Sequence, residues 1–188
     1  MGCTDGASIN SFALVSYIPD PLGGFLDRLR TELVCDCHAK AHVTLLPPRP
    51  LFCETSEAWS LLQQRLQDVQ PFEVKLGEIE IFPVTEVVYV SVVAGFEELR
   101  KLHASLDTGC LEFEEPFNFH PHVTLAQDLT NGQLAATLKS AVDRWREFRE
   151  PRAFTVDKLT FVQNTLDNRW MDLNSLRLAA VPVRKSGG

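Results

Sequence analysis

The tetrapeptide HVTL occurs twice in a chain that contains five histidines, once beginning at His42 and once at His122. Each copy places a threonine two positions after the histidine, Thr44 in the first and Thr124 in the second. Alternate side chains of a β-strand point to the same face, so each copy would present an imidazole and a hydroxyl together. Two such pairs in one cleft could cleave a phosphodiester without a metal ion. A neutral histidine accepts a proton, a protonated histidine donates one, and the hydroxyls donate hydrogen bonds to the phosphate.

Hydrophobic periodicity and turn residues predict the elements that would carry these motifs. The second helix is expected to be capped by Ser56 and to end before Pro71. A turn at Asp167-Asn168 is expected to join the last two strands. The predicted strands are 11–18, 41–46, 72–82, 87–93, 122–126, 154–162 and 170–178, and the other predicted helices are 22–34, 95–106 and 129–148.

The order strand, helix, HVTL strand, helix, strand appears twice, which indicates an internal duplication. The two HVTL words are 80 positions apart (122 − 42), and FEV at 72–74 matches FTV at 154–156, 82 positions later (154 − 72). Two copies predict pseudo-symmetry within one domain and not a solenoid. We therefore expect a single α+β domain over residues 1–188, with two intertwined lobes that each carry one motif. Antiparallel sheets should face a central cleft, with the helices outside.

With two H-x-T-hydrophobic words at this separation, the chain resembles the 2H phosphoesterases, which include 2′-5′ RNA ligase-like proteins and 2′,3′-cyclic nucleotide phosphodiesterases. The resemblance implies a bilobal α+β fold, activity on 2′,3′-cyclic phosphates or 2′-5′ linkages, and no cofactor. It also implies that His42 and His122 are the acid–base pair and that Thr44 and Thr124 bind the phosphate. We assign the general acid to His42 and the general base to His122, with the reverse assignment open.

Several further residues are candidates for the site. Many relatives carry a basic residue shortly after the second motif, where this chain has Gln127. Arg49, just after the first motif, could supply that phosphate contact. His120, two residues before His122, could orient it, whereas His103 is expected on the solvent face of a helix. Aromatic residues that could stack on a base are Phe12, Tyr17, Phe52, Phe119 and Trp170.

Composition limits the partners. The formal net charge of −7 argues against a long double-stranded nucleic acid, and the expected substrate is a nucleotide or an RNA terminus with a 2′,3′-cyclic phosphate. No apolar run approaches the roughly 20 residues of a membrane span. The five cysteines follow no disulfide framework, which predicts reduced thiols and a cytoplasmic protein. We expect a monomer.

Two other classes of function remain as alternatives. Cys35, Cys37, His38 and His42 could ligate the ion of a metal-dependent phosphohydrolase, although C-x-C-H is not the spacing of the usual zinc units. Alternatively, the fold could serve as a non-catalytic module that binds nucleotides or RNA. Metal analysis of the pure protein and a turnover assay separate these alternatives.

Overall fold

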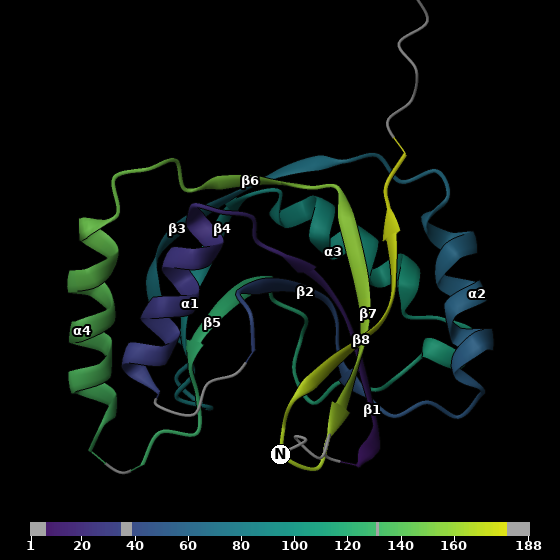
Figure 1. Ribbon diagram of the computed structural model, residues 1–188, viewed down its shortest axis with the longest axis horizontal. Helices are drawn as coiled ribbons and strands as arrows, with labels where there is room; N and C mark the ends of the chain where they lie inside the picture. The colour runs from purple at the N-terminus through teal and green to yellow at the C-terminus, as the bar shows by residue number, and fades with distance from the viewer. Residues whose placement is uncertain (1–6, 35–38, 131, 180–188) are drawn as a thin grey trace, which may run out of the picture.

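The structure is a computed structural model that describes residues 7–34, 39–130 and 132–179. Two four-stranded antiparallel sheets form its centre, with strand orders β2-β1-β7-β8 and β5-β4-β3-β6 (Figure 1). This is the expected α+β fold with antiparallel sheets. The strands are β1 (Ser8–Tyr17), β2 (His42–Arg49), β3 (Phe72–Ile81), β4 (Val88–Ala94), β5 (His122–Ala126), β6 (Ala153–Val156), β7 (Lys158–Thr165) and β8 (Trp170–Arg177).

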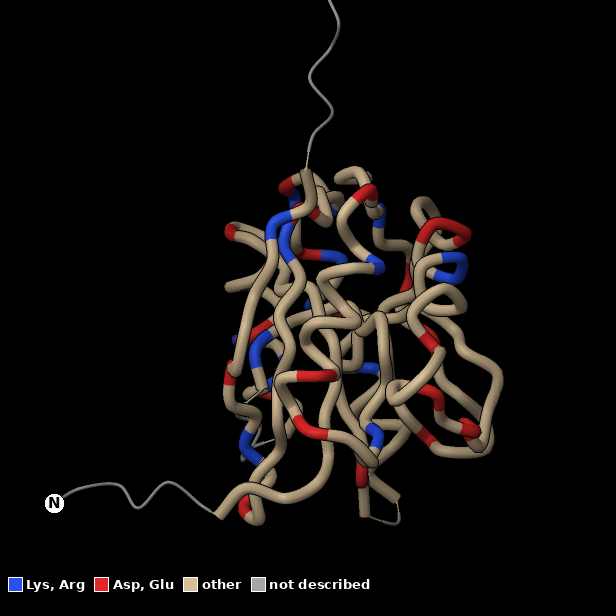
Figure 2. The backbone as a smooth tube through the Cα atoms, turned by 90° about the vertical axis from the view of Figure 1, so that its right-hand side faces the viewer, with Lys and Arg blue, Asp and Glu red and all other residues tan. Residues whose placement is uncertain are grey.

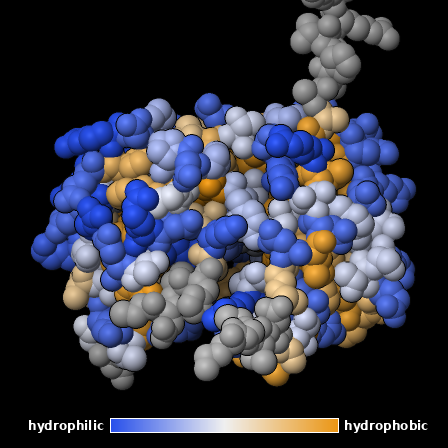
Figure 3. Space-filling view, viewed as in Figure 1, coloured by the Kyte–Doolittle hydropathy of each residue, from blue (hydrophilic) through white to orange (hydrophobic). Residues whose placement is uncertain are grey.

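Four α-helices and one short 3₁₀ helix cover the sheets. Helices α1 and α4 lie together on the left of the molecule and α2 lies on its right (Figure 1). The outer face beside α4 is mostly hydrophilic (Figure 3), and acidic and basic residues are interspersed over the molecule (Figure 2). The helices are α1 (Leu22–Leu33), α2 (Thr55–Leu66), α3 (Phe96–Leu106), η1 (Gly109–Leu111) and α4 (Leu134–Glu147).

The two halves of the chain exchange strands. Strand β3, the last element of the first half, pairs with β4 in the second sheet. Strand β7, near the end of the second half, pairs with β1 in the first sheet. Each sheet thus contains strands from both halves, and both HVTL strands, β2 and β5, lie at sheet edges.

The strand register repeats between the two sheets. In the first sheet Tyr17 lies opposite His42, and in the second Ser91 lies opposite His122. The second and fourth side chains of each HVTL point into the core, since Val43, Leu45, Val123 and Leu125 are all buried. The expected alternation of a core face and a polar face is therefore confirmed in both motifs.

Several sequence-based boundaries are wrong, including the start of β1 at Ser8 and the end of β2 at Arg49. The predicted strand 154–162 is two strands separated by Asp157, because β6 pairs with β3 and β7 crosses to pair with β1. Helix α2 begins one residue before Ser56, so Glu54 takes the N-cap position instead. Helix α4 begins at Leu134 and not at 129, because the amide of Thr130 donates to the side chain of Gln133 in a turn before the helix.

The expectation that His103 faces solvent is also wrong. Its Nδ1 lies 2.8 Å from the carbonyl oxygen of Leu45. Its ring stacks on Phe119 with 3.8 Å between ring centroids. His103 thus joins α3 to the first HVTL strand and to the segment that leads into the second.

The sequence showed no sign of a membrane span or of a disulfide framework. In the described part of the chain, no helix is long and apolar enough to cross a lipid bilayer. Cys53 and Cys110 are free thiols, and Cys35, Cys37 and His38 lie outside the described residues.

Candidate active site

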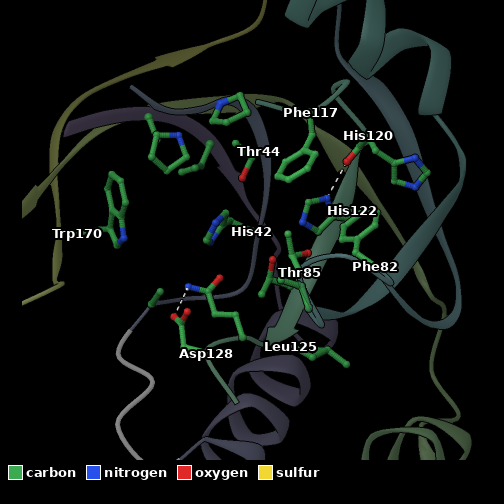
Figure 4. Close-up of a pocket in the computed structure, with 18 of the residues that line it drawn as sticks. His42, Thr44, Phe82, Thr85, Phe117, His120, His122, Leu125, Asp128 and Trp170 are labelled. Atoms are coloured by element: carbon green, nitrogen blue, oxygen red, sulfur yellow. Dashed lines mark hydrogen bonds between the residues drawn. The ribbon is translucent and has the colours of Figure 1, made fainter. Parts of the chain in front are cut away.

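The two HVTL strands border one cleft of about 1060 Å³. Strands β2 and β5 belong to different sheets but contact each other. His42, Thr44, His122 and Thr124 all line this cleft. Figure 4 shows His42, Thr44 and His122 in the middle of the cleft, with Trp170 on one side and Phe82 and Phe117 on the other. The structure therefore brings together the four residues that the sequence singled out.

Both motif histidines are held in the same way. Nδ1 of His42 lies 2.6 Å from the carbonyl oxygen of Lys40, and Nδ1 of His122 lies 2.7 Å from that of His120. A carbonyl oxygen can only accept a hydrogen bond, so each Nδ1 carries a proton and donates it. The Nε2 atoms are left to exchange protons with a ligand in the cleft.

The electrostatic environments of the two imidazoles differ. Burial lowers the pKa of His42 to about 4, with further lowering by the positive charge of Arg30 and by His122, although the hydrogen bond to Lys40 opposes the shift. Burial also lowers the pKa of His122, against the hydrogen bond to the His120 carbonyl. Both histidines therefore favour the neutral form, and His42 carries the additional effect of an adjacent cation.

The two threonines are available to a ligand. Thr44 and Thr124 are half-buried and share a strand face with their histidines. Within the described residues, neither hydroxyl forms a hydrogen bond to the protein. Each can donate a hydrogen bond to an oxygen of a bound phosphate.

His120 and Gln127 also line the cleft. The His120 carbonyl, and not its imidazole, makes the hydrogen bond that orients His122. The imidazole is exposed and lies edge-on to Phe82, with 5.4 Å between centroids. The Gln127 amide donates to the carboxylate of Asp128 at 3.1 Å, so an amide paired with an acid stands just after the second motif, where the resemblance led us to expect a base.

Arg49 is not brought to the cleft and instead forms a buried ionic cluster. Its side chain is 2% exposed, with Nη1 2.7 Å from Asp107 and Nη2 paired with Glu115. Nη1 also donates to the carbonyl of Leu111 at 2.8 Å. Because these bonds occupy the guanidinium, Arg49 joins the end of β2 to residues 107–115 and does not provide the phosphate contact suggested by the sequence.

Three of the five aromatic candidates line the cleft, namely Tyr17, Phe119 and Trp170. Phe12 is in the core, and Phe52, although 83% exposed, does not line the cleft. Phe119 lines the cleft but is stacked on His103. Trp170 and Tyr17 line it as well, and Tyr17 lies edge-on to His42 and donates its hydroxyl to Asp172 at 2.5 Å.

Sequence reasoning missed several residues of the cleft. Phe82, Phe117, Arg30, Asp128 and Asp172 all line it. The segment FNFH just before the second motif was a signal for Phe117, since phenylalanines close to a catalytic strand are candidates for contact with a ligand. Arg30 carried no such signal, because it is far from both motifs in a helix.

Metal ligation was one of the alternatives drawn from the sequence. Among the described residues, no group of three or more His, Cys, Asp or Glu side chains is arranged to hold a metal ion. Three of the four ligands considered, Cys35, Cys37 and His38, lie outside those residues.

The chain is similar to proteins of one known family. The model of the 2′-5′ RNA ligase superfamily matches residues 18–168. A putative phosphoesterase of Oceanobacillus iheyensis is 28% identical over 104 residues, which cover 50% of this chain and 61% of that protein. A putative phosphoesterase of Bacillus pumilus is 28% identical over 131 residues, covering 69% of this chain and 74% of that protein. The chain thus spans less than two thirds of the first of these relatives.

Among solved structures, the chain is similar to E. coli LigT. LigT complexed with phosphate aligns with a TM-score of 0.62 and 17% identity, covering 93% of this chain and 100% of that chain. LigT complexed with 3′-AMP aligns with a TM-score of 0.60 and 16% identity, covering 94% and 100%. At this level of identity the likeness shows a shared fold.

Proposed function

The chain belongs to the 2′-5′ RNA ligase superfamily, and on that premise we propose that it is a metal-independent phosphodiesterase that hydrolyses 2′,3′-cyclic phosphates of nucleotides or RNA ends. The observation that carries the proposal is the matched pair of histidines in one cleft. Each donates its Nδ1 proton to a backbone carbonyl, so both Nε2 atoms are available for proton transfer. Such a pair supplies a base and an acid without a metal ion.

In the proposed reaction, a water oxygen attacks the phosphorus of the cyclic ester while Nε2 of one histidine takes a proton from the water. The bond from phosphorus to the 2′ or 3′ oxygen breaks, and Nε2 of the other histidine gives that oxygen a proton. The product is a phosphate monoester, and exchange with solvent restores both histidines. The hydroxyls of Thr44 and Thr124 stabilise the charge on the non-bridging oxygens during attack.

The electrostatics favour His42 as the base and His122 as the acid, the reverse of the assignment we made from the sequence. A base must be neutral before it acts, and burial together with a neighbouring arginine keeps the pKa of His42 at about 4. Burial and the nearby His120 lower the pKa of His122, whereas Arg30 acts on the pKa of His42. His122 is therefore the better placed of the two to be protonated.

The cleft also offers aromatic surface to the base of a nucleotide. Trp170 and Phe117 offer aromatic surface on two sides of the catalytic residues (Figure 4), and stacking on such a surface stabilises a base by about 1–3 kcal/mol. Similarity to LigT, which has been crystallised with 3′-AMP, supports a nucleoside phosphate as the ligand.

The test is hydrolysis of the four 2′,3′-cyclic mononucleotides, each with and without excess EDTA. We expect turnover of at least one of them and no loss of rate with EDTA. Loss of activity on chelation, restored by added zinc or manganese, would support the metal-dependent alternative and overturn the metal-free mechanism. Binding without turnover, with a 2′,3′-cyclic RNA oligonucleotide included as substrate, would make the chain a non-catalytic binding module.

A further inference from the structure

Resting on the proposed function, we propose that Arg30 is the positioning residue that distinguishes the two histidines and commits His42 to the role of base. Arg30 lies in α1, lines the cleft and is 6% exposed. Its Nη1 donates to the carbonyl oxygen of Lys40 at 3.2 Å. That oxygen also accepts the Nδ1 proton of His42 at 2.6 Å. A guanidinium and the imidazole are thus held on one shared acceptor.

Among the described residues, no carboxylate forms an ion pair with Arg30, and its buried Nε has no hydrogen-bond partner. Buried arginines are usually paired, because an unpaired buried charge is costly. A guanidinium beside His42 disfavours a second positive charge there, and this effect contributes to the lowered pKa of His42.

The pseudo-symmetric position in the other lobe carries no charge. Tyr17 lies opposite His42 and Ser91 opposite His122, which gives an offset of 74 residues (91 − 17). The same offset relates the first residues of α1 and α3, since these helices begin at residues 22 and 96 (96 − 22 = 74). It places Ala104 where the first lobe has Arg30 (30 + 74).

The residues beside the His120 carbonyl differ from those beside the Lys40 carbonyl. Ala104 and His120 line a second cavity of about 520 Å³, next to the carbonyl that orients His122. Arg100 also borders this cavity, but its side chain is 54% exposed and pairs with Glu97 at 3.4 Å. Each histidine therefore makes the same kind of hydrogen bond to a backbone carbonyl. Among the described residues, a buried arginine donates to the acceptor of His42, and none donates to the acceptor of His122.

Other charged or titratable groups face His42, and they would be unchanged in an Arg30 variant. Tyr17 of β1 contacts its ring edge, and the Tyr17 hydroxyl is bonded to Asp172 of β8. The ammonium of Lys40 lies over the Tyr17 ring, 5.6 Å from its centroid. His122 of β5 acts on His42 through its charge. Asp128 lines the same cleft and accepts a hydrogen bond from Gln127. Glu115 also lines the cleft and is paired with Arg49.

The test compares Arg30→Met and Arg30→Lys with Arg28→Met, a matched control that removes an exposed arginine of the same helix. The pKa of each histidine is measured by NMR titration without substrate, and the pH profile of kcat/KM is measured with substrate. In Arg30→Met we expect the pKa of His42 to rise by about one unit, with the acid limb of kcat/KM moving the same way, because a neighbouring positive charge is lost. The pKa of His122 should stay unchanged, as should both values in Arg28→Met.

Arg30→Lys retains the positive charge but not the planar guanidinium. It therefore distinguishes the effect of the charge from the effect of the hydrogen bond to the Lys40 carbonyl. We expect its His42 pKa to stay near that of the parent, with kcat lowered at least fivefold and KM within twofold. Parental kcat in Arg30→Lys, or a parental His42 pKa in Arg30→Met, would overturn the proposal. If Arg30→Met does not fold, the kcat of Arg30→Lys decides. The titrations need no turnover, so failure of the parent to cleave any cyclic phosphate would refute the proposed function and leave the pKa test of Arg30 intact.

Discussion

His42 and His122 lie on edge strands of different sheets, yet each donates its Nδ1 proton to the carbonyl oxygen two residues before it in the chain. The hydrogen bond fixes the tautomer and the ring orientation at once. The same arrangement appears in both halves of the chain, whereas the surroundings of the two rings differ. In the proposed mechanism, those differences assign the roles of base and acid.

Replacing either cleft threonine should slow the reaction. Thr44→Val and Thr124→Val keep the β-branched shape and remove one hydrogen-bond donor, and loss of one such donor to a developing charge costs about 10²–10³-fold in kcat. Thr155→Val is the control, since Thr155 is an exposed strand threonine outside the cleft. Steady-state kinetics would measure the effect, and unchanged kcat in both cleft variants would show that the hydroxyls do not contact the phosphate.

The pH dependence follows from the two lowered pKa values. The proposed mechanism needs neutral His42 and protonated His122, so kcat/KM should rise through the pKa of His42, about 4, and fall through the pKa of His122, which lies below the ordinary value of 6.5. We expect a bell-shaped profile with both limbs on the acidic side of 6.5, whose apparent pKa values belong to the pair. A profile that stays flat between about pH 5 and 8 would exclude an acid–base pair with these properties.

Arg49→Met should reduce stability and leave the chemistry of the folded enzyme intact. It would leave Asp107 and Glu115 without their buried partner, which we expect to lower the free energy of unfolding by about 3 kcal/mol. Urea denaturation measures this change, and Arg100→Met, which breaks an exposed pair, should cost about 0–1 kcal/mol. A rise in KM without loss of stability would instead return Arg49 to the substrate site.

Trp170→Ala should weaken substrate binding more than it slows the chemical step. Trp170 lines the cleft beside His42 (Figure 4), and a base stacked on it would lose about 1–3 kcal/mol. Phe52→Ala is the control, because Phe52 is an exposed aromatic outside the cleft. The readout is KM for a cyclic mononucleotide, and a KM equal to that of the control would place the base elsewhere.

The sequence predicted the site better than its surroundings. The HVTL strands were predictable because identical alternating words leave little freedom in which side chains face the core. Arg49 was placed beyond the end of the strand, because the predicted strand stopped at residue 46, before Pro47-Pro48. In the structure β2 continues through both prolines to Arg49. An edge strand tolerates proline, and β2 is an edge strand.

Long-range features could not be predicted from local patterns. The segment 154–162 has the composition of a single strand, and only strand pairing shows that the chain changes sheets at Asp157. Arg30 has the spacing of an ordinary helix residue. Its role depends on how α1 packs beside Lys40, which no local pattern encodes.

The central claim is that His42 and His122 act together as base and acid. The most direct measurement is kcat of His42→Ala, of His122→Ala and of the double variant on a 2′,3′-cyclic nucleotide that the parent cleaves. Each single variant should lose about 10²–10⁴-fold, the usual contribution of a positioned acid or base. The double variant should lose less than the product of the two, because groups that act as a unit are not additive. Parental kcat in either correctly folded single variant would contradict the two-histidine mechanism.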